Sequence, residues 1–264
     1  MLLFKKIANG LRIQTSFITD VGKKRGRNED NYYVDGSISE PGDDNLSNTF
    51  DLSTSCKSGK FLVAVFDGVG GGLRGDEASY IAASKTRDYL RAFGNEDPAD
   101  MLIGLCDYLN SAVFSAAMEH KVFMMGTTIA ALYFCGKHVY SCNVGDSRCY
   151  RLRKSTLLML SEDHIESFSE TIGAEEKRKP GIVQYLGMDP SKYIISPVVT
   201  KFEARKGDKY LVCTDGLTDM VCEPDICRAL TNCKRSSEAA SELLTRALEN
   251  GGEDNITVAV SFVI

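Results

Sequence analysis

Acidic residues recur in this chain of 264 residues at the ends of apolar segments that are typical of β-strands. Residues 61–66 form a continuous apolar run that ends at Asp67-Gly68, and residues 209–214 run in the same way into Asp215-Gly216. The other acids at such positions are Glu29 and Asp30 before residues 32–34, Asp146 after residues 139–144, and Asp254 before residues 256–264. A carboxylate at the end of an apolar strand is held rigidly, yet its oxygens can point into a cleft.

Most of these acids stand beside glycine or asparagine, which bears on their chemistry. Mg²⁺ and Mn²⁺ prefer carboxylate, carbonyl and water oxygens as ligands, and glycine lets a cation approach the backbone carbonyl. A single Asp-Gly pair is ordinarily only a turn, but a turn does not require an acid each time. The chain has only three histidines and no cysteine–histidine spacing that fits zinc. The pattern therefore predicts an oxygen-lined Mg²⁺ or Mn²⁺ cluster.

A phosphate-binding cation would complete such a cluster, because paired divalent metal ions activate water for phosphoryl displacement. Arg25 lies five residues before Asp30 in the short basic run 23–27. A planar guanidinium grips phosphate oxygens with two parallel hydrogen bonds, so Arg25 is the best candidate. The alternative is that residues 23–27 are only a solvated basic loop.

The elements that must position these residues follow from hydrophobic periodicity. Apolar runs predict strands at residues 12–20, 61–66, 127–135, 139–144, 149–152, 157–160, 196–202, 209–214 and 256–264, and the close spacing from 127 to 160 predicts an antiparallel meander. Stripes with a 3.6-residue period predict helices at 75–93, 98–116 and 239–248. Strands and helices come in blocks, which favours an α+β fold with helices outside the sheets.

Two segments lack a clear period. Residues 36–60 are dominated by Gly, Ser, Asp, Asn and Lys, and we expect them to form an exposed loop. Residues 165–190 are charged and fit either a mobile surface flap or a short helix followed by a loop. Because there is no internal repeat and no long linker, we expect residues 1–264 to form one domain.

Composition argues against several other classes of protein. The net charge of −5 argues against nucleic-acid binding. No stretch approaches the ~20 apolar residues that span a bilayer, and lysines follow residues 1–4 too soon for a signal peptide. Nine cysteines without a Cys-x-x-Cys pair predict reduced thiols in a cytoplasmic protein.

Seven blocks in order resemble the metal-dependent (PPM, type 2C) serine/threonine protein phosphatase family, in its bacterial branch. They are Gly22-Lys-Lys-Arg25-Gly-Arg-Asn28-Glu29-Asp30, Val65-Phe-Asp67-Gly68-Val-Gly70-Gly71, Gly126-Thr127-Thr128, Asn143-Val-Gly145-Asp146-Ser147-Arg148-Cys-Tyr150, Asp163-His164, Cys213-Thr-Asp215-Gly216-Leu217-Thr-Asp219 and Asp254-Asn255-Ile-Thr257-Val258. A single Asp-Gly-x-Gly-Gly block would be weak evidence, whereas seven blocks that span residue 20 to the C-terminus are highly specific.

The resemblance implies a four-layer αββα sandwich, in which helices flank two antiparallel β-sheets and a metal centre lies at one end. It also implies an Mn²⁺- or Mg²⁺-dependent hydrolase that removes phosphate from phosphoserine and phosphothreonine by direct attack of metal-activated water. The partners that it implies are phosphorylated proteins, the substrates of a serine/threonine kinase, and the expected state is a monomer.

The resemblance also implies a role for each site residue. By position, Asp67 would bridge two metal ions, the Gly68 carbonyl would bind one of them, and Asp215 and Asp254 would bind the other. Asp146 would help to bind a third ion, together with Asp215. Glu29 and Asp30 would hold metal-bound waters, and Arg25 would grip the phosphate.

One position departs from some members of the family, which carry a histidine two residues after the bridging aspartate. This chain has Val69 there, and valine cannot donate a proton, so metal-bound water or His164 would have to protonate the leaving group. Two alternatives to an active protein phosphatase stay open. One is an inactive relative that binds phosphoproteins, against which the complete set of acids counts, and the other is a hydrolase of small phosphate esters.

Overall fold

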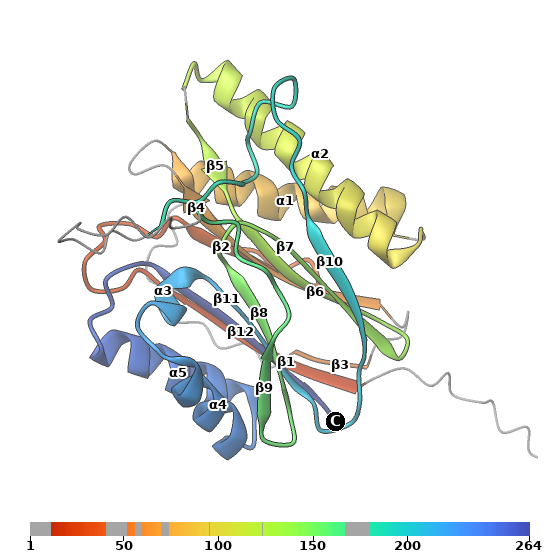
Figure 1. Ribbon diagram of the computed structural model, residues 1–264, viewed down its shortest axis with the longest axis vertical. Coiled ribbons are helices and arrows are strands. Elements are labelled where there is room, and N and C mark those ends of the chain that lie inside the picture. Colours follow the sequence, from red (N-terminus) through yellow and green to blue (C-terminus); the bar gives the residue numbers. More distant parts are fainter. Residues whose placement is uncertain are drawn as a thin grey trace, which may run out of the picture.

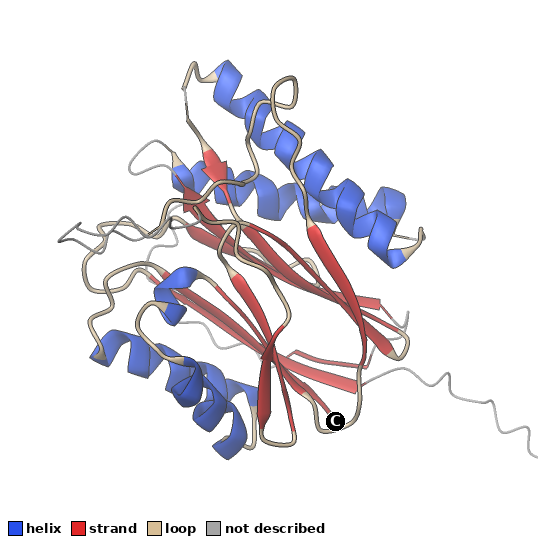
Figure 2. Ribbon diagram, in the orientation of Figure 1, coloured by secondary structure: helices blue, strands red, loops and turns tan. Residues whose placement is uncertain are grey.

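The computed structural model describes residues 12–40, 60–69, 74–94, 96–122, 124–166 and 180–264, together with a strand at residues 52–55. Two antiparallel β-sheets lie face to face, and helices cover the outer face of each sheet (Figures 1 and 2). The α+β sandwich of four layers that the sequence predicts is confirmed by this arrangement.

The first sheet has the strand order β3-β1-β12-β11-β8-β9. Its strands are β1 (Arg12–Asp20), β3 (Leu52–Ser55), β8 (Arg148–Arg153), β9 (Thr156–Met159), β11 (Lys209–Cys213) and β12 (Ile256–Val263). Helices α4 (Glu223–Asn232) and α5 (Ser236–Glu249) pack on its outer side, and the one-turn helix α3 (Asp215–Thr218) follows β11 (Figure 1).

The second sheet has the order β10-β7-β6-β4-β2, and the short strand β5 pairs with the end of β4. The strands are β2 (Asp30–Val34), β4 (Lys60–Val69), β5 (Gly126–Thr127), β6 (Ile129–Cys135), β7 (His138–Val144) and β10 (Val198–Glu203). Helices α1 (Gly75–Phe93) and α2 (Pro98–Glu119) cover its outer face (Figure 1).

Three layers of buried apolar side chains hold the sandwich together. Phe17, Val65 and Tyr210 belong to the layer between the two sheets. The other two layers lie between each sheet and its helices, so the central strands are buried on both faces. This double burial explains why residues 61–66 read as a continuous apolar run rather than an alternating pattern.

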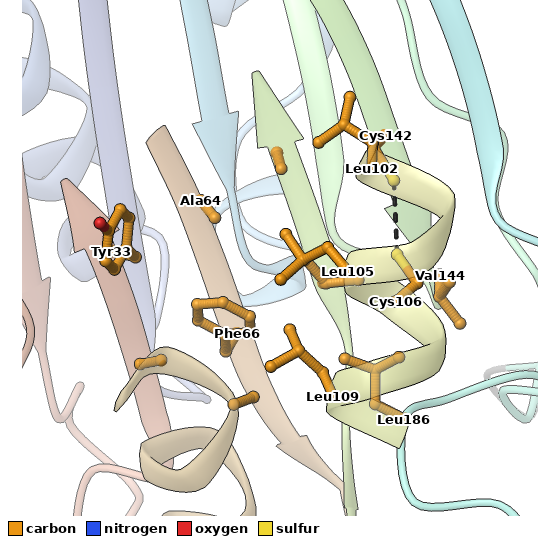
Figure 3. Close-up of a cluster of buried hydrophobic side chains, with 14 of the residues drawn as sticks. Tyr33, Ala64, Phe66, Leu102, Leu105, Cys106, Leu109, Cys142, Val144 and Leu186 are labelled. Carbon is orange, nitrogen blue, oxygen red and sulfur yellow. Dashed lines mark hydrogen bonds between the residues drawn. The ribbon is translucent and has the colours of Figure 1, made fainter. Parts of the chain in front are cut away.

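Helix α2 shows how an apolar sequence is used inside the protein. Asp97 caps its first turn by accepting a hydrogen bond from the N–H of Ala99 (2.9 Å), and Pro98 occupies the first helical position. Figure 3 shows Leu102, Leu105 and other α2 side chains packed toward the second sheet. By length and composition α2 is apolar enough to cross a membrane, contrary to the sequence expectation, but 44% of the relevant window is buried inside the protein.

The predicted meander is divided between the two sheets, which corrects the sequence interpretation. Strands β6 and β7 form one hairpin in the second sheet, whereas β8 and β9 form another in the first. The chain crosses between the sheets at residues 145–147. Hydrophobic spacing could not show this, because strands in either sheet have the same pattern.

The two segments without periodicity, residues 36–60 and 165–190, both contain backbone β-pairing. Residues 36–60 were expected to form an exposed loop, but β3 pairs antiparallel with β1, and Ser39 is buried. The polar sequence of β3 hides this edge strand, because its pairing uses backbone groups. Residues 41–51 and 56–59, and residues 167–179 of the flap-like segment 165–190, lie outside the described residues. The described ends of that segment pair with each other through Ile165 and Ile182.

Candidate metal centre

One end of the sandwich brings together acids that are far apart in the sequence. The end of β4 and the start of α3 lie on the same side of the molecule (Figure 1). A cleft of about 280 Å³ opens there and is lined by Arg25, Glu29, Asp67, Gly68, Val69, Asp146, Pro180, Ile182, Asp215, Asp254 and Asn255. Of the eight site residues predicted from the sequence, Asp30 does not line this cleft.

Asp67 is held by a set of hydrogen bonds from residues 127 and 128. Its carbonyl oxygen accepts the N–H of Thr128 (2.8 Å) and the hydroxyl of Thr127 (2.9 Å). The Asp67 N–H donates to the hydroxyl oxygen of Thr128 (3.1 Å). The Thr128 hydroxyl is also hydrogen-bonded to the hydroxyl of Ser147 (2.7 Å). These bonds fix the backbone of Asp67 and so fix the point from which its side chain enters the cleft.

Gly68 lies where the backbone of α1 comes very close. A Cβ atom at this position would lie 2.4 Å from the carbonyl oxygen of Gly75 and 2.7 Å from that of Glu29. No side chain fits in this space. The Gly68 N–H donates to the Glu29 carbonyl (3.2 Å), which ties the two acidic segments together.

Asn255 connects Asp254 to the loop that carries Arg25 and Glu29. The Asn255 N–H donates to Oδ1 of Asp254 (2.8 Å), and its side-chain oxygen accepts the N–H of Glu29 (2.8 Å). Its amide nitrogen donates to the carbonyl oxygens of Val21 and Arg27, each at 2.9 Å. In the sequence, Asn255 is marked only by its place in the Asp-Asn-Ile-Thr block, which does not predict these contacts.

Asp30 is buried behind the cleft and is 5% exposed. Its Oδ2 accepts hydrogen bonds from the hydroxyls of Thr214 (2.8 Å) and Thr257 (2.7 Å). Burial raises the pKa of Asp30 to about 8, although these two hydrogen bonds oppose the shift. Asp30 therefore supports the strand ends that precede Asp215 and follow Asp254, and it does so from outside the cleft.

The carboxylates of the cleft repel one another. The pKa of Asp67 is raised well above its ordinary value by burial and then by the charges of Asp215, Asp30, Asp146 and Asp254. Burial also raises the pKa of Glu29. Several hard oxygen donors that destabilise each other's negative charge are the donor set that a divalent cation stabilises. The residues present therefore fit the predicted Mn²⁺ or Mg²⁺ ions.

Arg25 forms an ion pair with one of these acids, Asp254. Its Nη2 donates to Oδ2 of Asp254 at 2.7 Å, and 47% of the Arg25 side chain and 34% of the Asp254 side chain are exposed. Among the residues that the structure describes, no three acidic, cysteine or histidine side chains lie close enough together to hold one metal ion. Arg25 and a metal ion at Asp254 would therefore compete for the same carboxylate oxygen.

Asp146 lies at the crossing between the two sheets and is 6% exposed. The preceding Gly145 forms two hydrogen bonds with His164, one to its ring and one to its backbone. Its N–H donates to Nδ1 of His164 (3.0 Å), and its carbonyl accepts the His164 N–H (3.0 Å). Burial lowers the pKa of His164, which favours the neutral ring that this bond requires. His164 is not among the residues that line the cleft, so its position supports a structural role rather than proton donation.

The sequence of the chain matches a family model described as Protein phosphatase 2C over residues 39–252. A curated relative is the serine/threonine phosphatase stp of Listeria monocytogenes, which is 31% identical over 259 residues that cover 93% of this chain and 94% of the relative. The serine/threonine protein phosphatase PstP of Mycobacterium tuberculosis is 33% identical over 80% of this chain. The aligned part spans only 42% of the mycobacterial protein's length.

Solved structures are similar over nearly the whole chain. The Streptococcus agalactiae serine/threonine phosphatase has a TM-score of 0.75 and 26% identity, with 96% of this chain and 100% of that chain covered. The catalytic domain of PstP in complex with two manganese ions has a TM-score of 0.73 and 29% identity, with 96% and 99% covered. With the acid-lined cleft, the β-sandwich and these similarities taken together, the chain belongs to the protein phosphatase 2C family.

Proposed function

We propose that this protein is a metal-dependent serine/threonine phosphatase that hydrolyses phosphoserine and phosphothreonine in other proteins. The observation that supports this most directly is the cleft lined by Asp67, Asp146, Asp215 and Asp254, with Arg25 at its edge. Four carboxylates and one guanidinium match a reaction that needs divalent cations and a phosphate. The names of the relatives support the same reaction, and membership of the family supports the metal dependence.

The side chains of the cleft divide this work between them. Asp67, the Gly68 carbonyl, Asp215 and Asp254 are proposed to hold two Mn²⁺ or Mg²⁺ ions, and Asp146 with Asp215 a third. Such ions, when bound, supply activated water and stabilise charge on the phosphoryl group. Glu29 lies beside them as a hydrogen-bond acceptor for water.

Arg25 is proposed to bind the phosphate once Asp254 no longer engages it. Two parallel N–H donors then orient the phosphoryl group in the cleft. Val69 lines the cleft but has no ionisable proton, and His164 is not among the residues that line the cleft. The leaving group is therefore proposed to take its proton from water rather than from a side chain.

The biological context is proposed on the same basis. Substrates are expected to be proteins phosphorylated by a serine/threonine kinase, and the chain is expected to act as a cytoplasmic monomer. The negative net charge and the thiols suit this setting. Eight cysteines of the described residues are free, and Cys106, Cys142, Cys149 and Cys213 are buried among them.

The decisive experiment compares hydrolysis by the wild-type protein with hydrolysis by Asp215→Asn. Removing the charge of a direct ligand should cost more than the roughly 100-fold that loss of an outer hydrogen-bond partner costs. We expect hydrolysis of a phosphothreonine peptide with Mn²⁺ by the wild type, and loss of activity and weaker Mn²⁺ binding in the variant, with an unchanged circular dichroism spectrum. Asp88→Asn is the matched control, because Asp88 is half exposed on α1.

The two alternatives predict different outcomes of this experiment. A phosphoprotein-binding relative would bind the peptide but release no phosphate with either Mn²⁺ or Mg²⁺. A hydrolase of small phosphate esters would release phosphate from an aryl phosphate but not from the peptide. Either result would overturn the proposal.

A further inference from the structure

A second pocket lies at the opposite end of β4 from the metal centre. Its volume is about 340 Å³, and its lining includes Tyr33, Asp35, Lys60, Leu62, Arg87 and Arg91. It shares no residue with the acid-lined cleft. Lys60 begins β4 and Asp67 lies near its end, so at about 3.3 Å per residue the two sites are roughly 20 Å apart. The pocket is therefore separate from the proposed catalytic centre.

The charge of this pocket is opposite to that of the metal centre. Three cations, Lys60, Arg87 and Arg91, line it together with a single acid, Asp35. Arg87 and Arg91 are four residues apart on α1, so their side chains leave the same face of the helix. Within the described ranges, neither arginine forms an ion pair with a carboxylate. Two guanidinium groups are thus available to an anion from outside.

The floor of the pocket is made of side chains that are almost fully buried. Leu62 is 2% exposed, Tyr133 is 4% exposed and Tyr33 is 5% exposed, and all three belong to the layer between the second sheet and its helices. Tyr33 and Tyr133 each contribute a phenol ring to this floor, and the charges of Asp35, Arg87 and Arg91 lie close enough to act on Tyr33 electrostatically.

The size and lining of the pocket indicate the class of ligand. Its volume is at the lower end of the ~300–1,000 Å³ typical of small-molecule sites. The cationic rim suits a phosphate, because Arg–phosphate hydrogen bonds are charge-assisted and geometrically matched. The side chains of Leu62 and Leu90, which line the pocket on the α1 side of the sheet, suit a small apolar or aromatic body.

We propose that this pocket between α1 and the start of β4 is a second binding site, which takes a small phosphate monoester with an apolar or aromatic body. The phosphate lies against Arg87, Arg91 and the ammonium of Lys60, which already donates to the Gly94 carbonyl at the end of α1. The body lies on the floor beneath. This site does not depend on the proposed phosphatase activity.

Isothermal titration calorimetry with phenyl phosphate tests the site on the full chain in EDTA. Chelation removes the ions on which phosphate binding in the acid-lined cleft depends and prevents hydrolysis. We expect saturable binding by the wild type, and a loss of at least about tenfold in affinity for each of Arg87→Ala and Arg91→Ala. Arg25→Ala and Lys85→Ala should bind like the wild type, because Arg25 lies in the other cleft and Lys85 pairs with Asp88 on α1 (3.7 Å).

Three other probes separate the contributions of the phosphate and of the apolar body. Benzoate has the ring with a single charge, inorganic phosphate has the charge without the ring, and phenol has the ring without the charge. Weaker binding of benzoate and of inorganic phosphate, with no binding of phenol, supports the proposal. No binding of phenyl phosphate by the wild type would overturn it, and so would loss of binding in Arg25→Ala with retention in Arg87→Ala. Alanine favours helix, so the α1 variants are expected to fold, which their thermal unfolding checks.

Discussion

Arg25 has two possible partners in the cleft, the carboxylate of Asp254 and the phosphate of a substrate. In the structure it pairs with Asp254, an acid proposed to bind a metal ion, and both side chains are partly exposed. An ion pair that is open to solvent contributes little, about 0–1 kcal/mol. A divalent cation bound at Asp254 would therefore have only a weak ion pair to displace, which would leave the Arg25 guanidinium free at the edge of the cleft.

The variant Arg25→Ala tests this exchange. We expect a KM for a phosphothreonine peptide that is at least about tenfold higher, because two charge-assisted hydrogen bonds to phosphate are lost. Calorimetry should show Mn²⁺ binding that is equal to or tighter than that of the wild type, because Asp254 no longer has a competitor. Arg27→Ala is the control, since Arg27 pairs with Asp76 (3.1 Å). Unchanged KM in Arg25→Ala would remove Arg25 from the phosphate role.

Asp208 carries the second residue-scale prediction, which concerns stability. Its side chain is 2% exposed and accepts hydrogen bonds from Nε and Nη2 of Arg153, each at 2.7 Å. It also accepts the N–H of Arg205 (2.8 Å) and the hydroxyl of Tyr210 (3.2 Å). Removing Asp208 takes the acceptor from Nε of Arg153, from the N–H of Arg205 and from the Tyr210 hydroxyl, so Asp208→Ala should lower the free energy of unfolding by about 3 kcal/mol.

The contribution of Asp208 should also depend on pH. Burial opposes its ionisation, but the bonds from Arg153, Arg205 and Tyr210 outweigh burial and lower its pKa in the folded protein. The stabilisation is therefore complete above the unfolded pKa of about 4 and is lost as pH falls through the lower folded value. Urea unfolding from pH 7 to pH 2 should show the wild type approaching Asp208→Ala at the acid end. A constant difference would contradict this, and Glu203→Gln, at an exposed acid, should have little effect.

At the scale of elements, the sequence predicts most strands and three of the helices, but not their assignment to sheets. Burial on both faces produces apolar runs such as residues 61–66, and these are legible in any sequence. Strand β3 pairs through its backbone, and helix α4 has only ten residues, so neither leaves a strong pattern. The chain passes from the second sheet to the first between β7 and β8, and this crossing depends on tertiary packing, which hydrophobic periodicity does not predict.

In the candidate site, too, the local sequence predicts the residues but not the contacts between them. Acids at strand ends are visible in the sequence, and seven of the eight predicted residues line one cleft. The position of Asp30 behind that cleft depends on the hydroxyls of Thr214 and Thr257, which come from two other segments. The pairing of Arg25 with Asp254 joins residues 229 positions apart. Contacts of this kind arise from the folded arrangement and have no local signature.

Gly145 supports a prediction about the crossing between the sheets. Its φ is +105°, and a Cβ atom would lie 2.6 Å from Cγ2 of Thr128, the residue whose hydroxyl binds the Asp67 N–H. Gly145→Ala should therefore cost more than about 2 kcal/mol and reduce activity by moving Asp146 and Thr128. Gly136→Ala is the matched control, because Gly136 has a φ of +59° with open space around it. Its expected cost is about 1 kcal/mol without loss of activity, and equal effects of both variants would contradict the argument.

At the scale of the whole molecule, a chain of contacts connects the outer helix α2 with the metal centre. Asn110 on α2 is buried, and its side-chain oxygen accepts the N–H groups of Gly187 (2.8 Å) and Met188 (2.9 Å). Leu186 exchanges two backbone hydrogen bonds with Thr127, whose hydroxyl donates to the carbonyl of Asp67. Pro180 and Ile182, in the same segment as Leu186, line the cleft. One helix residue thus holds the segment that borders the site.

The variant Asn110→Ala should release this segment without touching any acid of the cleft. The N–H groups of Gly187 and Met188 lose their acceptor, so we expect the free energy of unfolding to fall by about 2 kcal/mol. Because Pro180 and Ile182 line the cleft, we expect the KM for a phosphorylated protein, which can contact more of this segment, to change more than the KM for an aryl phosphate. Ser111→Ala is the control, since the Ser111 hydroxyl bonds only within α2 (2.9 Å, to the Asp107 carbonyl). Equal changes in KM for both substrates would show that α2 acts on the metal centre itself, through Thr127 and Asp67, rather than on access to it.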